Sequence, residues 1–179
     1  MPKKKAFLIV DGYNIIGNWE KLKECLKISL ENARNSLLDM MAEYSKMSGE
    51  KIIVIFDAYN TDQPRTTYKY KGLDVVFTEK EETADKYIER FLDSEGRRKL
   101  IEVATNDSLI QKTILSRGGL RISASELKHR YLTYKEDLYR LEKKKRNSYN
   151  KNLVSLDDGV IKKIDHLIEN LGEKGKGKN

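Results

Sequence analysis

Two patterns of apolar residues alternate along the chain: short uninterrupted runs, and longer segments in which apolar residues recur every three or four positions. The short runs predict buried strands at residues 6–10, 51–56, 73–78, 100–104 and 120–122. The longer segments predict helices at about 30–47 and at about 83–94, and a short helix that follows residues 105–107 and ends at residue 116. The polar stretch 59–70, which contains Pro64, is expected to be a loop. Strands that alternate with helices predict an α/β fold with right-handed crossovers and a central parallel sheet of about five strands covered on both faces.

Residues that favour helix ends bound several of these segments. Ser29 is typical of an N-cap, and Gly49 is typical of the position just after a helix. Ser123 and Glu126 have the spacing of a capping box, which predicts that a long basic helix begins there. A similar pattern at 155–158 predicts the start of a last helix. We therefore expect a globular domain at 1–127, a basic helical extension at 128–171 and a disordered tail at 172–179.

Four aspartates lie just beyond the predicted strands, on their carboxyl-terminal side. Asp11 and Asp57 follow their strands directly, and Asp107 follows the fourth strand closely. Asp85 lies in the first turn of the helix that comes after the third strand. Each has a structural interpretation, because aspartate favours turns and helix N-termini. Parallel topology nevertheless brings these chain ends to one edge of the sheet, where the ligand sites of such folds gather.

Four converging carboxylates repel one another unless a cation or a proton intervenes. The chain has one cysteine and two histidines, and both histidines lie in the C-terminal helices, so zinc fits poorly. Oxygen ligands suit Mg²⁺ or Mn²⁺, which bind phosphate oxygens and activate water. Asn14 is placed to orient a phosphate or a water. Two neighbouring residues have two interpretations each. Glu82 either joins the cation site or supplies a negative charge in the first turn of the helix predicted at about 83–94. Asn106 either flanks the site or shapes a turn.

The composition indicates a globular protein without a membrane span, a signal peptide or an internal disulfide. The chain has 179 residues, of which 39% are hydrophobic and 35% charged, enough for one domain with a core. Its longest apolar run, 52–56, falls far short of the ~20 residues of a membrane span. The apolar stretch near the N-terminus is too short for a signal peptide, and a single cysteine permits no internal disulfide. We therefore expect a cytoplasmic protein with no membrane association.

The net charge of +7 is unevenly distributed. Nine basic residues against three acidic ones give residues 128–151 a charge of +6, and the body of the chain is mildly acidic. An acidic site next to a basic extension fits hydrolysis of a nucleic acid that the extension holds, whereas the alternative is a merely solvated helix face. The basic residues that we expect to bind the polyanion are Lys128, Arg130, Lys135, Arg140, Lys143, Lys144, Lys145 and Arg146.

Several short motifs occur in order along the chain. They are Asp-Gly-Tyr-Asn at 11–14, Val-Ile-Phe-Asp-Ala at 54–58, Val-Phe-Thr at 76–78, Glu-Thr-Ala-Asp at 82–85, Ala-Thr-Asn-Asp at 104–107 and the segment 118–127. Together they resemble the YacP-like branch of the NYN domain, within the PIN-like nuclease superfamily. One departure is that residues 105–107 read Thr-Asn-Asp where Thr-Ser-Asp is expected, which keeps the aspartate.

The resemblance implies a PIN-like three-layer domain that acts as a metal-dependent endoribonuclease, cutting mRNA in association with the ribosome and leaving 3′-hydroxyl and 5′-phosphate ends. It implies Mg²⁺ or Mn²⁺ as cofactor and the ribosome as a partner of the basic extension. By position, the acidic residues of the family match Asp11, Asp57, Asp85 and Asp107, and its asparagine matches Asn14. The expected metal ligands are Asp11, Asp85 and Asp107.

Other functions are alternatives. A non-catalytic RNA- or ribosome-binding module would keep the basic helix and lose the metal. A haloacid-dehalogenase-type phosphatase needs a second aspartate two residues after the first, where this chain has Tyr13. A dinucleotide-binding enzyme needs a Gly-x-Gly-x-x-Gly turn after the first strand, which residues 11–17 do not supply.

Overall fold

The structure, a computed structural model, describes residues 6–58, 64–80, 82–96 and 99–174, with the side chains of all of these except residues 6, 148–161 and 164–174. The chain forms two compact units, Met1–Lys135 and Glu136–Asn179. The division falls inside one helix, α6 (Ala124–Lys174). None of the described helices is both long and apolar enough to cross a membrane.

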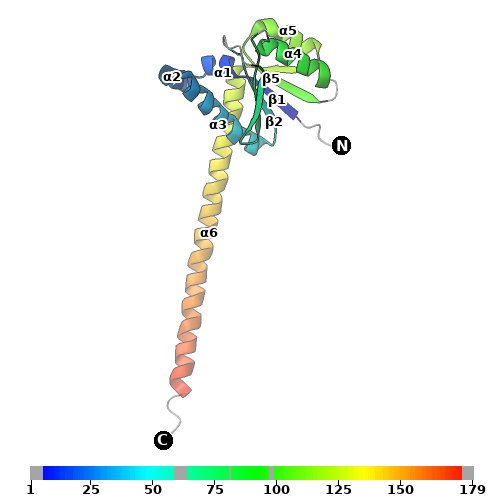
Figure 1. Cartoon of the computed structure of the whole chain (residues 1–179). Coiled ribbons are helices and arrows are strands. Elements are labelled where there is room, and N and C mark those ends of the chain that lie inside the picture. The colour runs from blue at the N-terminus through cyan, green and yellow to red at the C-terminus, as the bar shows by residue number, and fades with distance from the viewer. Residues whose placement is uncertain (1–5, 59–63, 81, 97–98, 175–179) are drawn as a thin grey trace. The chain divides into compact units, whose positions relative to one another are not determined.

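A six-stranded sheet with the order β3-β4-β2-β1-β5-β6 forms the centre of the first unit (Figure 1). All neighbouring pairs are parallel except β3 and β4, which are antiparallel. The sheet thus confirms the expected α/β fold and has one strand more than the sequence predicts. The strands are β1 (Ala6–Asp11), β2 (Lys51–Phe56), β3 (Thr66–Tyr70), β4 (Leu73–Phe77), β5 (Leu100–Ala104) and β6 (Leu120–Ile122).

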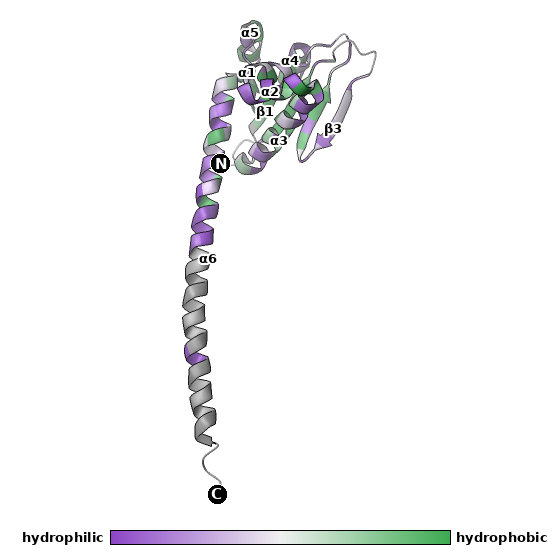
Figure 2. Cartoon of the chain, turned by 90° about the vertical axis from the view of Figure 1, so that its left-hand side faces the viewer, coloured by the Kyte–Doolittle hydropathy of each residue, from purple (hydrophilic) through white to green (hydrophobic). Residues whose placement is uncertain are grey.

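Helices cover both faces of the sheet and bury one core on each, so that the unit has three layers (Figure 1). Alternate residues of a strand point to opposite faces, so Leu8 packs in one core and Ile9 in the other. The apolar strands between the more polar helix surfaces are visible in Figure 2. The first core lies under α1 (Gly12–Asn18), α2 (Glu20–Ile28), α3 (Leu30–Ser48) and the start of α6. The second lies under α4 (Ala84–Glu95) and α5 (Ser108–Ser116).

Local hydrogen bonds confirm the predicted helix ends. The Ser29 hydroxyl accepts from the backbone N–H of Asn32 at 3.0 Å, and Gly49 has a φ of 72° at the C-terminal end of α3. The capping box at the start of α6 is formed: Glu126 accepts from the Ser123 backbone N–H at 2.6 Å, and the Ser123 hydroxyl accepts from the Glu126 N–H at 3.2 Å.

Three segments differ from the prediction. Strand β3 lies in the stretch expected to be a loop, joined to β4 by a two-residue turn in which Lys71 and Gly72 have φ angles of 48° and 97°. Helices α1 and α2 occupy a region for which the apolar pattern predicted no element. Helix α6 runs through residues 155–158 without a break, because nothing there ends it, and it includes 172–174 of the expected tail. Residues 175–179 lie outside the described part of the chain.

Candidate functional site

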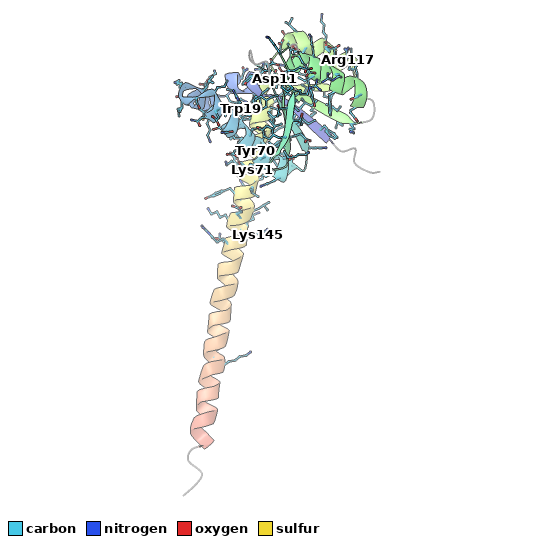
Figure 3. The ribbon with its side chains drawn as sticks, in the orientation of Figure 1. Asp11, Trp19, Tyr70, Lys71, Arg117 and Lys145 are labelled. Atoms are coloured by element: carbon cyan, nitrogen blue, oxygen red, sulfur yellow. The ribbon has the colours of Figure 1, made fainter. Side chains whose placement is uncertain are left out.

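The carboxyl ends of four adjacent parallel strands, β4-β2-β1-β5, bring the four aspartates to one edge of the sheet. Asp11 is the last residue of β1 and also the N-cap of α1. One oxygen of its carboxylate accepts from the Asn14 backbone N–H at 3.3 Å. The other accepts from the hydroxyl of the buried Thr105 at 3.1 Å. The carboxylate of Asp11, labelled in Figure 3, is therefore held rigidly at the end of its strand.

Asp57 connects the end of β2 to the start of α4. Its carboxylate accepts a hydrogen bond from the backbone N–H of Ala84, the first residue of that helix. Asp85 comes next and lies in the first helical turn, where the helix dipole favours a negative charge. In the part of the chain that the structure describes, the Asp85 carboxylate accepts no hydrogen bond. Asp57 thus fixes the helix that presents Asp85.

Asp107 caps α5 and is joined to Asp11 through Thr105. The Asp107 carboxylate accepts from the Leu109 N–H at 2.8 Å, and the Asp107 N–H donates to the Thr105 hydroxyl at 3.1 Å. Since that same hydroxyl donates to Asp11, one buried threonine links the ends of β1 and β5. Thr105 is fully buried, so its place is inside this network, not in contact with a phosphate.

The four carboxylates act on one another electrostatically. The pKa of Asp11 is raised from 3.8 to about 6, chiefly by burial; the hydrogen bonds from Asn14 and Thr105 oppose the rise, and the charges of Asp85 and Asp57 add to it. Burial also raises the pKa of Asp85, as do the neighbouring charges of Asp107 and Asp57. The edge of the sheet therefore brings together carboxylates whose negative charges oppose one another.

Oxygen-only donors at this edge fit a hard divalent cation, although no closed cage is formed. Among the described side chains, no three His, Cys, Asp or Glu residues are gathered as a ready-made metal site. Mg²⁺ does not require one, because it commonly binds through one or two carboxylates and completes its shell with waters and substrate phosphates. That Asp11, Asp85 and Asp107 are the ligands stays a prediction.

An asparagine network next to the acidic edge orients Asn14. The Asn14 side-chain oxygen accepts from the backbone N–H of Asn106 at 2.8 Å. The Asn106 side chain in turn donates to Asn18 at 2.8 Å and accepts from the N–H of Ala124 at 2.9 Å. Asn106 thus joins α1 to the start of α6. The Nδ2 group of Asn14 has no acceptor among the described residues, which leaves it free to donate to a ligand.

Glu82 is an ion-pair residue. It is 8% exposed, and its carboxylate lies 2.7 Å from Arg65 and 2.5 Å from Arg90. Two guanidinium groups already neutralise this carboxylate, so the structure supports neither the cation-site nor the first-turn interpretation of Glu82.

Six of the eight basic residues that we expect to bind the polyanion fall into two groups. Arg130 binds the Glu102 carboxylate through both terminal nitrogens, at 2.6 and 3.1 Å, and Lys135 lies 3.3 Å from Glu43. These contacts attach the first turns of α6 to the sheet and to α3, so the two side chains have partners within the chain. Lys145, labelled in Figure 3, belongs with Lys143, Lys144 and Arg146 to an exposed group further along the helix.

The aromatic residues of this region differ in burial. Tyr131 is buried, and its hydroxyl donates to Glu43 at 2.6 Å. Tyr134 packs edge-on against Tyr44, with ring centroids 5.4 Å apart. Trp19 is also buried, which places it in the core and not on a partner surface. Tyr139 is exposed and is the one described tyrosine of the extension without a packing role.

A three-layer α/β domain with an acidic edge at the carboxyl ends of its parallel strands has the architecture of the PIN-like, nuclease-like class. The chain belongs to the YacP-like NYN domain family, whose sequence pattern matches residues 8–169. It is 35% identical to the protein YacP of Bacillus subtilis (strain 168) over 162 residues, covering 88% of this chain and 94% of the relative.

Solved structures agree with this assignment. The crystal structure of Rae1 (YacP) from Bacillus subtilis matches with a TM-score of 0.69 and 34% identity, over 91% of this chain and 94% of that one. A single-substitution variant of Rae1 matches with a TM-score of 0.65 and 38% identity, over 75% and 80% of the two chains. The resemblance seen in the motifs is therefore confirmed.

The raised pKa of Asp11 predicts that the stability of the metal-free protein depends on pH. Because the folded-state pKa lies near 6 and the ordinary value is 3.8, the carboxyl group stabilises the fold below about pH 4, and this contribution is lost as the pH rises through 6. The loss is at most about 3 kcal/mol. Asp11→Asn removes the charge and keeps one of the two acceptor oxygens. In a chelator, urea unfolding should show this variant gaining stability over the parent between pH 4 and 7; a difference that does not change with pH would contradict the assignment.

Proposed function

We propose that the chain is a metal-dependent endoribonuclease that hydrolyses RNA phosphodiester bonds, with mRNA on the ribosome as its substrate. The observation that carries the proposal is the convergence of Asp11, Asp57, Asp85 and Asp107 at one edge, where their charges oppose one another. Membership of a nuclease-like family supports the same chemistry.

The side chains have distinct roles in this proposal. Asp11, Asp85 and Asp107 would hold Mg²⁺ or Mn²⁺, which when bound supplies an activated water and neutralises charge on the cleaved phosphate. Asn14 donates from Nδ2 to a phosphate oxygen, with its amide orientation fixed by Asn106. Asp57 positions Asp85 through the start of α4.

A cleavage assay tests the proposal directly. Translating ribosomes and naked RNA are each incubated with the protein, with and without divalent metal. We expect cleavage only with the metal, and faster cleavage on ribosomes. RNA or ribosome binding without cleavage in every condition would instead support the alternative, a binding module with a nuclease-like body.

The exposed basic group of α6 is the part of the chain that we expect to bind RNA or the ribosome. The variant Lys144→Gln/Lys145→Gln removes two charges from this group. It should weaken binding and lower the salt slope of the affinity by roughly 0.7 for each phosphate that is no longer neutralised, while hydrolysis of a short substrate is unchanged. The matched control is Lys162→Gln/Lys163→Gln, two exposed lysines of the same helix. Equal sedimentation of both variants with ribosomes, and equal RNA affinity, would contradict this role.

A further inference from the structure

Arg34 lies at the acidic edge although no motif includes it. Helix α3 ends next to the start of β2, at the amino edge of the sheet, so its first turns lie at the carboxyl edge. Arg34 is in the second of these turns, four residues after Leu30 and four before the buried Leu38. A charged side chain thus occupies the stripe of α3 that faces the core.

Aromatic rings hold the guanidinium group beside the acidic edge. Its central carbon lies 5.8 Å from the ring centre of Tyr13 and 5.5 Å from that of Phe77, within the range of cation–π attraction. Tyr13 follows Asp11 by two residues and packs against Phe56 with centroids 5.2 Å apart. Phe56 directly precedes Asp57 in the chain. The elements that carry the aspartates therefore also position this arginine.

Arg34 forms no ion pair with a carboxylate in the part of the chain that the structure describes. The residue is partly buried, and its Nε atom is buried without a hydrogen-bond acceptor. The other partly buried arginines of the described residues all have oxygen partners: Arg117 and Arg130 bind carboxylates, and Arg121 donates to a backbone carbonyl. A buried donor and an unpaired buried charge are both costly, so such a group is poised to gain an anionic partner.

We propose that Arg34 binds a backbone phosphate of the RNA, next to the phosphate that is cut; this inference rests on the proposed function. A guanidinium group presents a planar fork of donors that matches phosphate oxygens, and flanking rings keep that fork in one plane. The carboxylate edge would take the scissile phosphate through its metal. Arg34, on the α3 side of the same edge, takes a neighbouring phosphate directly and so sets the path of the strand.

The test measures binding of a short fluorescent single-stranded RNA in a chelator, where no cleavage occurs. Arg34→Gln and Arg34→Met both remove the charge, and Met also keeps an apolar stem against Tyr13 and Phe77. Each should weaken binding and lower the slope of log affinity against log salt by about 0.7. Lys46→Gln, an exposed position at the other end of α3, removes the same charge and should leave the slope unchanged. Thermal unfolding verifies that each variant is folded.

A second measurement identifies the contact on the parent protein itself. A series of RNAs, each with one neutral methylphosphonate linkage, should show one linkage at which the parent loses affinity and Arg34→Met does not. If both neutral variants bind as the parent does, with the same slope and the same linkage profile, Arg34 is a packing residue and the inference is overturned while cleavage by the parent still supports the proposed function. If the parent binds no RNA at any salt concentration in the chelator, the Arg34 inference is overturned, whereas the proposed function is overturned by the absence of cleavage with the metal present.

Discussion

Asp85→Asn is expected to lower the rate of RNA cleavage by at least about 100-fold while RNA affinity is retained. Asparagine has the shape of aspartate but lacks the charge that binds a divalent cation. The bond from Asp57 to the start of α4 stays in place, and Asp85 itself accepts no hydrogen bond within the described residues, so the fold should be unaffected. Single-turnover cleavage of a short RNA and its binding in a chelator measure the two quantities separately.

The matched control for this variant is Asp93→Asn, which lies on the same helix and loses an ion pair with Arg117 of 2.7 Å. Its carboxylate is 58% exposed, and it should cut within about twofold of the parent, because exposed ion pairs contribute little. Undiminished cleavage by Asp85→Asn would refute the metal-site assignment, whereas equal losses in both variants would point to damage to α4.

Trp19→Ala should lower the free energy of unfolding by about 3–5 kcal/mol. The side chain is 1% exposed, its ring stacks on Tyr131 with centroids 6.4 Å apart, and its Nε1–H donates to the carbonyl oxygen of Ala124 at 2.8 Å. The substitution therefore leaves a cavity between α1, α2 and the start of α6, and it removes the hydrogen bond to the Ala124 carbonyl.

Urea unfolding followed by circular dichroism measures this loss, since Trp19 is the single tryptophan and its fluorescence disappears with it. Trp19→Phe keeps most of the apolar volume but not the hydrogen bond, and a smaller loss of about 1–2 kcal/mol is expected. A loss below about 1 kcal/mol for Trp19→Ala would show that the site collapses around the smaller side chain.

The five parallel strands could be predicted because a parallel strand of a covered sheet is a short, continuous apolar run. Strand β3 could not be recognised by that pattern, since it pairs at the sheet edge and its side chains are largely exposed. The sequence does indicate a β-hairpin here, because the two-residue turn Lys71-Gly72 separates the β-branched and aromatic residues of β3 from β4. Helix α1 is seven residues long and contains two glycines, so it shows no helical period of its own.

The acidic edge was predictable from topology, because parallel strands bring residues far apart in sequence to one edge. What individual polar side chains do there was not predictable. Glu82 is paired with arginines from two segments, and Asn106 bonds to helices at either end of the unit, and both arrangements depend on tertiary contacts. Arg34 is recognisable in the sequence as a charged residue within the apolar stripe of α3. Its position between two aromatic rings, on which its proposed role depends, is seen only in the structure.

Three of the four aspartates at the edge also hold helix N-termini, and this bears on how relatives of the chain can diverge. Asp11, Asp57 and Asp107 each accept a backbone N–H at the start of α1, α4 or α5. Under the proposed function, a relative that lost catalytic activity would therefore still be selected to keep these three residues for folding. Asp85 accepts no backbone N–H among the described contacts. Substitution of Asp85 alone, with the other three aspartates retained, would therefore identify a relative without catalytic activity.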